Sequence, residues 1–378
     1  MDFNLNDEQQ QFGESLRRWV ARDYAFDARE RIIASSDGVS AAAWSTLAEL
    51  GMTALPVPEA QGGFAGDAQD MFVVMRELGR GLVVEPYFAT MLGAEFLRLG
   101  GAHPALLEQV AGGQLTLACA LGEPQSRHDL ADIATRAVDS GDAYLIDGRK
   151  VSVIHGAQAG QLIVSARTAG AQCERDGVTV LVLPADAEGI RVTGYRTLDG
   201  MRAADIVFDQ VRAPKSNVIG GWALLEQATD YGAALLCAEA MGGLEALFEA
   251  TLDYLKTRSQ FGVPIGKFQA LQHRMADMAI HLEQARSMAM LAAIKAGADD
   301  AAERRRCVAA AKYRVGQAIR FIGQQAIQLH GGMGMTNELP ASHYFKRLST
   351  IELTLGDSDH HLARFMGEPG FLTEEEHA

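Results

Sequence analysis

A glycine-rich stretch near the C-terminal end is the first candidate for ligand binding. It reads Gln328-Leu329-His330-Gly331-Gly332-Met333-Gly334-Met335-Thr336 and follows a helical pattern. Glycines let backbone amides approach a ligand, and consecutive amides can cradle a phosphate. A helix C-cap followed by a loop is the simpler interpretation of Gly331-Gly332. The stretch contains neither the GK[ST] of a Walker loop nor a GxGxxG after a strand, so alone it is a weak indication.

A second candidate connects two predicted long helices. It reads Arg258-Ser259-Gln260-Phe261-Gly262 and continues through Ile265-Gly266-Lys267-Phe268-Gln269 to Gln272. An arginine with several amide side chains can hold a pyrophosphate through charge-assisted hydrogen bonds. The same residues are also common at solvated helix ends. The residues alone leave both interpretations open.

A third candidate, Gly356-Asp357-Ser358-Asp359-His360-His361, places acids beside adjacent histidines. Side chains at successive helical positions diverge by about 100°, so His360 and His361 cannot easily share one metal ion. The pattern favours a capped helix start with Asp357 or Ser358 as the N-cap. We therefore expect no metal site here. The chain also lacks the GxSxG of a serine nucleophile.

Hydrophobic periodicity divides the chain into three segments that must position these candidates. Residues 1–115 are predicted helical, for example at Phe12, Leu16, Trp19 and Val20, with a second helix ending at Gly51. A third helical run covers Met71 to Leu82.

Residues 116–220 are rich in short β patterns. Tyr144-Leu145-Ile146, Asp147-Gly148 and Arg149-Lys150-Val151 predict a hairpin with a two-residue turn. Further strands are predicted at 161–164, 178–183, 190–192 and 206–208. Strands of this length and spacing predict a small barrel or sandwich.

Residues 221–378 form long apolar stripes at helical spacing, typical of a helical bundle. One stripe runs from Leu224 to Leu255, one from Leu271 to Ala289 and one from Val308 to Leu329. Small residues such as Gly242 and Gly243 would let two helices approach closely. The fold class predicted from the three segments is α+β.

Composition limits the classes of function. The 378 residues include 34 basic and 48 acidic side chains, giving a net charge of −14, which argues against nucleic-acid binding. Four scattered cysteines without a CxxC pair fit reduced thiols. We see no signal-peptide pattern and no run of eighteen apolar residues. These features predict a soluble, cytoplasmic protein without a membrane span.

Taken together, the patches resemble the acyl-CoA dehydrogenase family over essentially the whole chain. The resemblance is carried by motifs in all three segments: Leu5-Asn6-Asp7-Glu8-Gln9-Gln10, Leu50-Gly51-Met52, Pro58-Glu59-Ala60-Gln61-Gly62-Gly63, Asp147-Gly148-Arg149-Lys150, Val207-Phe208-Asp209 through Pro214, Arg258-x-Gln260-Phe261-Gly262 with Gln269, and Gln328-x-x-Gly331-Gly332.

The resemblance implies an N-terminal helical domain (1–115), a central β-barrel or sandwich domain (116–220) and a C-terminal four-helix bundle (221–378) in a tetramer. It also implies FAD as cofactor, an acyl-CoA thioester as substrate in fatty acid degradation, and an electron-transfer flavoprotein as electron acceptor. In the family, a set of bundle residues reaches the adenine and pyrophosphate half of FAD, largely in the neighbouring subunit. These are Arg258, Phe261, Gln269, Gln328, Gly331 and Gly332.

The catalytic base of the family does not appear at its usual positions. The family has a Glu immediately before Gly-Thr, whereas this chain reads Leu355-Gly356-Asp357. A minority of members place the base in the first long bundle helix, at a position that falls here on Gly232. Asp357 and Asp230 lie two residues from these positions, so Asp357 is the candidate base of this chain.

Motifs that face the flavin ring in the family are also altered. Thr-Glu-Pro-x-Ala-Gly-Ser appears as Gly122-Glu123-Pro124-Gln125-Ser126-Arg127-His128, and Trp-Ile-Thr appears as Ser152-Val153-Ile154. The bundle motifs, by contrast, are intact.

We therefore expect a subunit that pairs with a paralogue carrying the catalytic Glu. It resembles the small subunits of heteromeric acyl-CoA dehydrogenases, such as those acting on pimeloyl-CoA. Three alternatives remain open. They are a self-sufficient homotetramer using Asp357 or Asp230 as base, a non-catalytic structural subunit, and a relative using the same flavin pocket for other chemistry.

Overall fold

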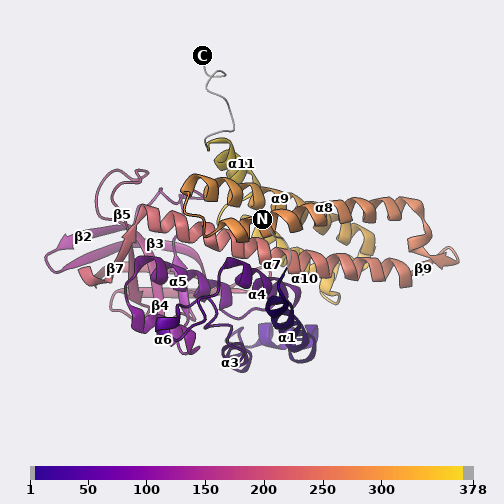
Figure 1. Cartoon of the computed structure of the whole chain (residues 1–378), viewed down its shortest axis with the longest axis horizontal. Helices are drawn as coiled ribbons and strands as arrows, with labels where there is room; N and C mark the ends of the chain where they lie inside the picture. The colour runs from indigo at the N-terminus through magenta and orange to yellow at the C-terminus, as the bar shows by residue number, and fades with distance from the viewer. Residues whose placement is uncertain (1–4, 369–378) are drawn as a thin grey trace, which may run out of the picture. The chain divides into compact units, whose positions relative to one another are not determined.

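The computed structural model describes residues 5–368 and confirms the α+β class, with helices first, then strands, then long helices (Figure 1). The chain forms two compact units. The sheet unit comprises residues 32–67 and 84–232, and the bundle unit comprises the described parts of 1–31, 68–83 and 233–378. Helix α7 (Trp222–Thr257) contributes to both.

The bundle unit consists of helices whose apolar stripes are buried as the periodicity predicted. Helix α9 contacts α8, α10 and α11, and α1 begins with a capping box at Asn6. Its helices besides α7 are α1 (Asp7–Asp23), α4 (Ala68–Arg80), α8 (Gln269–Lys295), α9 (Ala301–His330), α10 (Pro340–Leu353) and α11 (Ser358–Met366), together with the first part of α2 (Phe26–Ala34).

Helix α7 is long and apolar enough to pass a length and composition test for a membrane span. However, 89% of its most apolar window is buried inside the protein. Leu235, Leu244 and Leu247 are among its fully buried side chains. The hydropathy of α7 is therefore explained by its place in the core.

The sheet unit contains one eight-stranded sheet in the order β6-β7-β3-β2-β4-β5-β8, with β1 paired to β4. Strands from both halves of the sheet contribute to a single apolar core that includes Ile146, Leu181 and Phe208. The strands are β1 (Leu117–Ala120), β2 (Arg136–Ser140), β3 (Ala143–Ile154), β4 (Gln161–Arg167), β5 (Val178–Pro184), β6 (Ile190–Arg196), β7 (Arg202–Pro214) and β8 (Val218–Gly221), accompanied by helices α3 (Ala41–Glu49), α5 (Tyr87–Gly100) and α6 (Pro104–Ala111).

The predicted hairpin turn at Asp147-Gly148 is wrong, because β3 continues through these residues as one strand. The register against β7 shifts between Ile146 and Gly148, and Asp147 Oδ1 accepts a hydrogen bond from the Gln210 amide at 2.9 Å. The turn lies instead at Gly141-Asp142, where Ser140 pairs with Ala143. The sequence signal that suggested a turn therefore marks a β-bulge.

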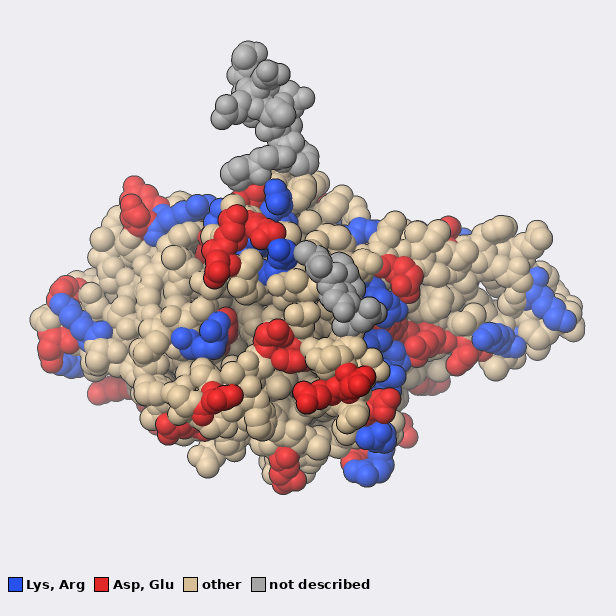
Figure 2. Space-filling view, in the orientation of Figure 1, with Lys and Arg blue, Asp and Glu red and all other residues tan. Residues whose placement is uncertain are grey.

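The surface of this chain carries both positively and negatively charged side chains. On the face shown in Figure 2, Lys and Arg side chains are interspersed with Asp and Glu. Ion pairs on the surface of the sheet unit include Arg149 with Asp205 at 2.7 Å and Arg212 with Asp142 at 2.7 Å. Exposed pairs of this kind contribute little to stability.

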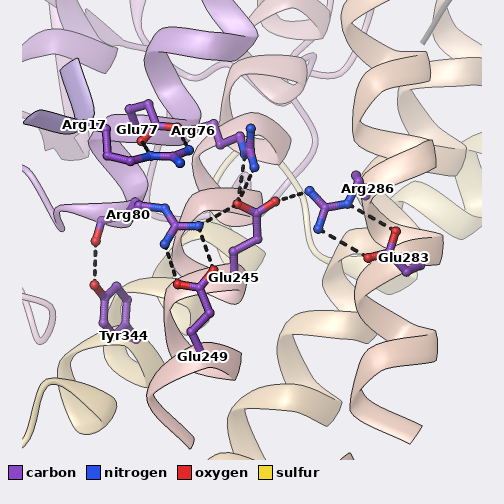
Figure 3. Close-up of polar contacts among 9 residues, drawn as sticks. All are labelled: Arg17, Arg76, Glu77, Arg80, Glu245, Glu249, Glu283, Arg286 and Tyr344. Carbon is purple, nitrogen blue, oxygen red and sulfur yellow. Dashed lines mark hydrogen bonds and ion pairs between the residues drawn. The ribbon is translucent and has the colours of Figure 1, made fainter. Parts of the chain in front are cut away.

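A buried carboxylate joins the N-terminal helices to the long helices within the bundle unit (Figure 3). Glu245 of α7 accepts from Arg76 Nε at 2.9 Å and from Arg80 Nη2 at 3.0 Å, both on α4. Arg286 of α8 bonds to the other oxygen of the same carboxylate. Arg80 also reaches Glu249 at 2.7 Å, one turn along α7. The network ties α4, α7 and α8 together through one desolvated acid.

Helices α4 and α7 also approach each other at backbone distance, as the small residues of α7 predicted. A Cβ placed on Gly242 would lie 1.7 Å from the carbonyl oxygen of Arg76, and one on Gly79 would lie 2.0 Å from the carbonyl oxygen of Glu239. Both collisions are with backbone, which cannot rotate away. Glycine is therefore required sterically where the helices cross.

We expect Gly242→Ala to lower the free energy of unfolding by about 1–3 kcal/mol, because the added methyl group forces the two helix backbones apart. Gly243→Ala is the matched control, since its Cβ would meet a flexible Leu348 methyl at 3.2 Å. Urea unfolding followed by circular dichroism measures both variants. Equal effects from the two substitutions would contradict the close crossing.

Candidate functional site

The short hairpin after α7 carries a strained, exposed aromatic residue. Strands β9 (Ser259–Gln260) and β10 (Val263–Pro264) pair antiparallel, with Phe261-Gly262 at the tip. Phe261 has a φ of +55°, and its side chain is 88% exposed. A left-handed backbone costs a non-glycine residue roughly 1–2 kcal/mol, and a side chain this exposed recovers little of it from packing. Strain of this kind points to a role in binding.

The glycine-rich stretch is both the helix end and an open backbone surface. Gly331 is the C-cap of α9, with φ +61° and ψ −140°, a conformation available to glycine. The 3-10 turn η4 (Gly331–Met335) follows. A Cβ built on Gly331 or Gly332 would meet no described atom within 4 Å. The C-cap interpretation is confirmed, and the backbone remains accessible to a ligand.

The structure brings these two patches to the same end of the bundle unit. Tyr254, in the last turn of α7, stacks on His330, the last residue of α9, with ring centroids 4.5 Å apart. Arg274, near the start of α8, donates to Gln325 near the end of α9 at 2.7 Å. All six predicted cofactor residues are exposed at this end: Arg258, Phe261, Gln269, Gln328, Gly331 and Gly332.

This arrangement can hold a diphosphate. Arg258 supplies a permanent positive charge with several N–H donors. The open backbone at Gly331-Gly332 lets a phosphate come close to main-chain amides. Gln269 and Gln328 add amides that both donate and accept. The residues therefore fit the diphosphate-bearing half of a dinucleotide cofactor.

Asp357, the candidate base, is engaged as a helix cap. Its carboxylate accepts a hydrogen bond from the His360 amide at 2.8 Å at the start of α11, as the N-cap prediction requires. The Asp357 side chain is buried. Asp230, the other acid near a family base position, is buried in the sheet unit. Among residues 5–368, no three His, Cys, Asp or Glu side chains gather as a metal site.

The turn just before Asp357 is held by side chains that the sequence analysis did not single out. Leu355 has a φ of +55°. Lys312 Nζ bonds to three carbonyl oxygens around this turn, and His361 Nε2 bonds to the carbonyl of Leu355. A signal was present in the sequence: Lys312 interrupts the apolar stripe of α9, one turn after Val308.

Two family-motif residues of the sheet unit form a buried ion pair. Lys150 Nζ lies 2.7 Å from Glu123 Oε1 and also donates to the Leu121 carbonyl and to Ser165. Burial alone would raise the pKa of the Glu123 carboxyl, but the Lys150 ammonium and hydrogen bonds from Gln125 and Thr135 outweigh it and lower that pKa to about 2. These motif residues hold the sheet unit together.

A buried arginine shapes the loops beside this pair. Arg167 donates to the carbonyl oxygens of Ala131 at 2.8 Å, Gln172 at 2.6 Å and Glu174 at 2.9 Å. Arg167 also donates to further carbonyl oxygens in the two loops that contain Ala131 and Gln172. The guanidinium thus fixes the loop that follows the Gly122–His128 motif.

Ser152 stands at a position that faces the flavin ring in the family, and in this chain it makes polar contacts within the sheet unit. Ser152, at a bulge in β3 with φ +54°, receives a hydrogen bond from Tyr195 Oη at 3.3 Å. Asp205 accepts from the Ser152 amide at 3.3 Å and from Tyr195 at 3.1 Å. A serine here offers no aromatic ring for packing against a flavin. These residues of the sheet unit fit a flavin ring less well than the residues at the end of the bundle unit fit a diphosphate.

Three family models match successive parts of the chain. They are the acyl-CoA dehydrogenase N-terminal domain over residues 6–103, the middle domain over 118–211 and the C-terminal domain over 220–366. The matched order of a helical, a sheet and a helical domain agrees with the observed order of elements.

Individual proteins show the same similarity. A probable acyl-CoA dehydrogenase, YngJ of Bacillus subtilis, is 30% identical and covers 95% of this chain and 97% of its own. A solved structure described as the Tcur3481-Tcur3483 steroid ACAD G363A variant is 27% identical, with a TM-score of 0.87 over 95% of this chain and 96% of that one. An FAD complex of PigA is 26% identical, with a TM-score of 0.88 over 98% of this chain and 100% of that one.

We expect Glu123→Gln to lower the free energy of unfolding at pH 7 by about 3 kcal/mol, because the amide leaves the buried Lys150 ammonium without a carboxylate. In the natural protein the ionised Glu123 carboxylate contributes fully to the free energy of unfolding above its ordinary pKa near 4.5. That contribution is lost as the pH falls toward 2. The difference between the two proteins should therefore narrow on acidification.

Urea unfolding followed by circular dichroism at pH 7, 5 and 3 measures this difference. Asp142→Asn is the control, because its carboxylate pairs with Arg212 on the surface, and it should change stability by less than about 0.5 kcal/mol. A Glu123→Gln difference that stays constant with pH would contradict the assignment.

Proposed function

The chain belongs to the acyl-CoA dehydrogenase family, and on that premise we propose that it is a flavoprotein subunit completing the FAD site of a paralogous partner. Members of this family are FAD-dependent oxidoreductases. The partner in this proposal carries the catalytic Glu and the flavin-ring pocket. Together, the two subunits convert an acyl-CoA into an α,β-unsaturated acyl-CoA.

The observation that carries the proposal is the contrast between two parts of the bundle unit. At one end, Arg258 and Phe261 are exposed and the backbone of Gly331 is open, so these groups are available to a cofactor. In the turn between α10 and α11, the family base position holds Leu355, whose side chain has no atom that can accept a proton. The chain has cofactor-binding groups without the usual base.

The chemistry divides accordingly between the two chains. A bound FAD would supply the acceptor for the β-hydrogen of the acyl chain, which leaves as hydride. A carboxylate takes the α-proton, and low dielectric around that carboxylate raises its basicity toward neutral pH. In this proposal Arg258 and the open backbone around Gly332 hold the cofactor diphosphate, Phe261 packs against the adenine side, and Gln269 and Gln328 orient it. Leu355 contributes apolar surface only.

Asp357 is poorly suited to replace the missing Glu. One oxygen of its carboxylate caps α11 by accepting from the His360 amide at 2.8 Å, and the side chain is buried. A shift of the turn would also disturb the bonds that Lys312 and His361 make to it. The heteromeric arrangement needs no such movement.

Further features of the proposal follow from the family. One similar structure bears two designations, Tcur3481 and Tcur3483, for a steroid ACAD, which supports a two-chain enzyme. We infer a heterotetramer that passes electrons to an electron-transfer flavoprotein. Four free cysteines among the described residues support a reducing, cytoplasmic location.

We expect Arg258→Ala to weaken FAD binding by the two-chain complex by about 10- to 100-fold, because a charge-assisted hydrogen bond to the diphosphate is lost. Lys256→Ala, which removes a neighbouring exposed cation from the end of α7, is the matched control and should leave FAD affinity unchanged. Fluorescence titration of the complex with FAD measures both. An Arg258→Ala complex with full FAD affinity would instead support a purely structural subunit.

We expect Asp357→Asn to leave octanoyl-CoA turnover by the complex within about twofold, because asparagine caps a helix as well as aspartate does. The measurement is steady-state turnover with a dye acceptor, alongside FAD content. Loss of turnover with FAD still bound would identify Asp357 as the base and would support the self-sufficient enzyme.

A further inference from the structure

The turn between α10 and α11 has a backbone that needs outside support. Leu355 adopts a left-handed conformation with φ +55°, which is unfavourable for a residue with a side chain. Its side chain carries no hydrogen-bonding group that could compensate locally. Helix α10 ends just before this turn, so its last carbonyl groups also need partners.

Lys312 supplies those partners from α9. Its Nζ donates to the carbonyl oxygens of Ile351 at 2.9 Å, Glu352 at 3.0 Å and Gly356 at 3.0 Å. The first two belong to the last turn of α10, and the third lies beyond Leu355. A protonated amine has three N–H groups, so every donor is used. One buried ammonium therefore clamps both sides of the Leu355 turn.

His361 completes the clamp from α11. Its Nε2 lies 2.9 Å from the Leu355 carbonyl, and because a carbonyl can only accept, Nε2 carries the proton. Burial lowers the pKa of His361 well below its ordinary value, so the ring is neutral. The carbonyl groups of residues 351, 352, 355 and 356 are thus all bound by two side chains.

We propose that Lys312 is a positioning residue that locks the Leu355 turn and so fixes where residue 355 meets the acyl-CoA. The functional part of this inference rests on the proposed function and adds to it that the apolar surface of Leu355 borders the acyl-CoA. The clamp bonds only to backbone atoms, so it operates whatever side chain stands at 355. In this chain it presents an apolar surface.

Burial of Lys312 makes the clamp sensitive to pH, and acidic groups nearby oppose the effect. Cys237 of α7, Glu352 of α10, and Asp357 and His361 of α11 surround it. Burial raises the pKa of the Cys237 thiol to about 12, so that thiol is neutral. Glu352 is bound by Arg320 at 2.7 Å and by Ser358. Burial lowers the pKa of Lys312 to about 8.

Deprotonation of Lys312 removes one of three N–H donors, so a neutral amine must release one carbonyl. The test is amide hydrogen exchange by mass spectrometry on the full chain, following peptides across 350–362 and correcting for the intrinsic effect of pH. We expect protection of this turn to fall about fivefold between pH 7 and pH 9.5. Amide protection of peptides from α8 and α9 should show no such fall.

Lys312→Met should lower protection of the turn at least tenfold at pH 7 and abolish its pH dependence. Lys295→Met is the matched control, because Lys295 pairs with Glu303 at 2.7 Å on the same unit and does not reach the turn. Should Lys312→Met fail to fold, Lys312→Gln takes its place. A turn that keeps its protection in the variant, or a loss of protection spread evenly over the bundle, would overturn the clamp.

A binding measurement then tests the functional part. Calorimetric titration of the complex with octanoyl-CoA should show weaker binding for Lys312→Met and unchanged binding for Lys295→Met. A turn that loosens without any change in octanoyl-CoA binding would overturn the positioning role. The exchange experiment needs neither FAD nor the partner subunit. Its result therefore tests the clamp separately from the Arg258→Ala measurement, which tests the proposed function.

Discussion

Buried cations whose hydrogen bonds run to main-chain carbonyl groups hold the loops on which this protein depends. Lys312 clamps the turn after α10, Arg167 fixes two loops of the sheet unit, and Lys150 binds the Leu121 carbonyl as well as Glu123. Moving a charge into the interior costs several kcal/mol unless its donors are satisfied. Each loop therefore cannot shift without leaving a buried charge unbonded.

This constraint separates residues with a structural role from residues that await a ligand. Glu123 and Lys150 belong to a family motif, and their burial and mutual contact explain them without a cofactor. Arg258 and Phe261 also belong to a family motif, but they are exposed, and Phe261 is strained. Stability of the isolated chain gives no reason for such residues, whereas the proposed binding of a cofactor diphosphate does.

The sequence predicted whatever depends on local pattern. Helical periodicity located α7, α8 and α9, and capping chemistry predicted Asp357 or Ser358 as an N-cap, of which Asp357 is the one observed. The turn at Asp147-Gly148 was wrong because the same residues suit a bulge, and only pairing with Gln210 decides between them. Lys312 was missed because its acceptors lie about forty residues later in the chain. Such contacts are tertiary, and spacing does not reveal them.

In the proposed function this chain offers cofactor-binding groups but no base of its own. The most direct measurement is the flavin absorbance of the chain purified alone with excess FAD, before and after anaerobic addition of octanoyl-CoA. The account predicts substoichiometric FAD and no bleaching. Stoichiometric FAD that is bleached by octanoyl-CoA would contradict it.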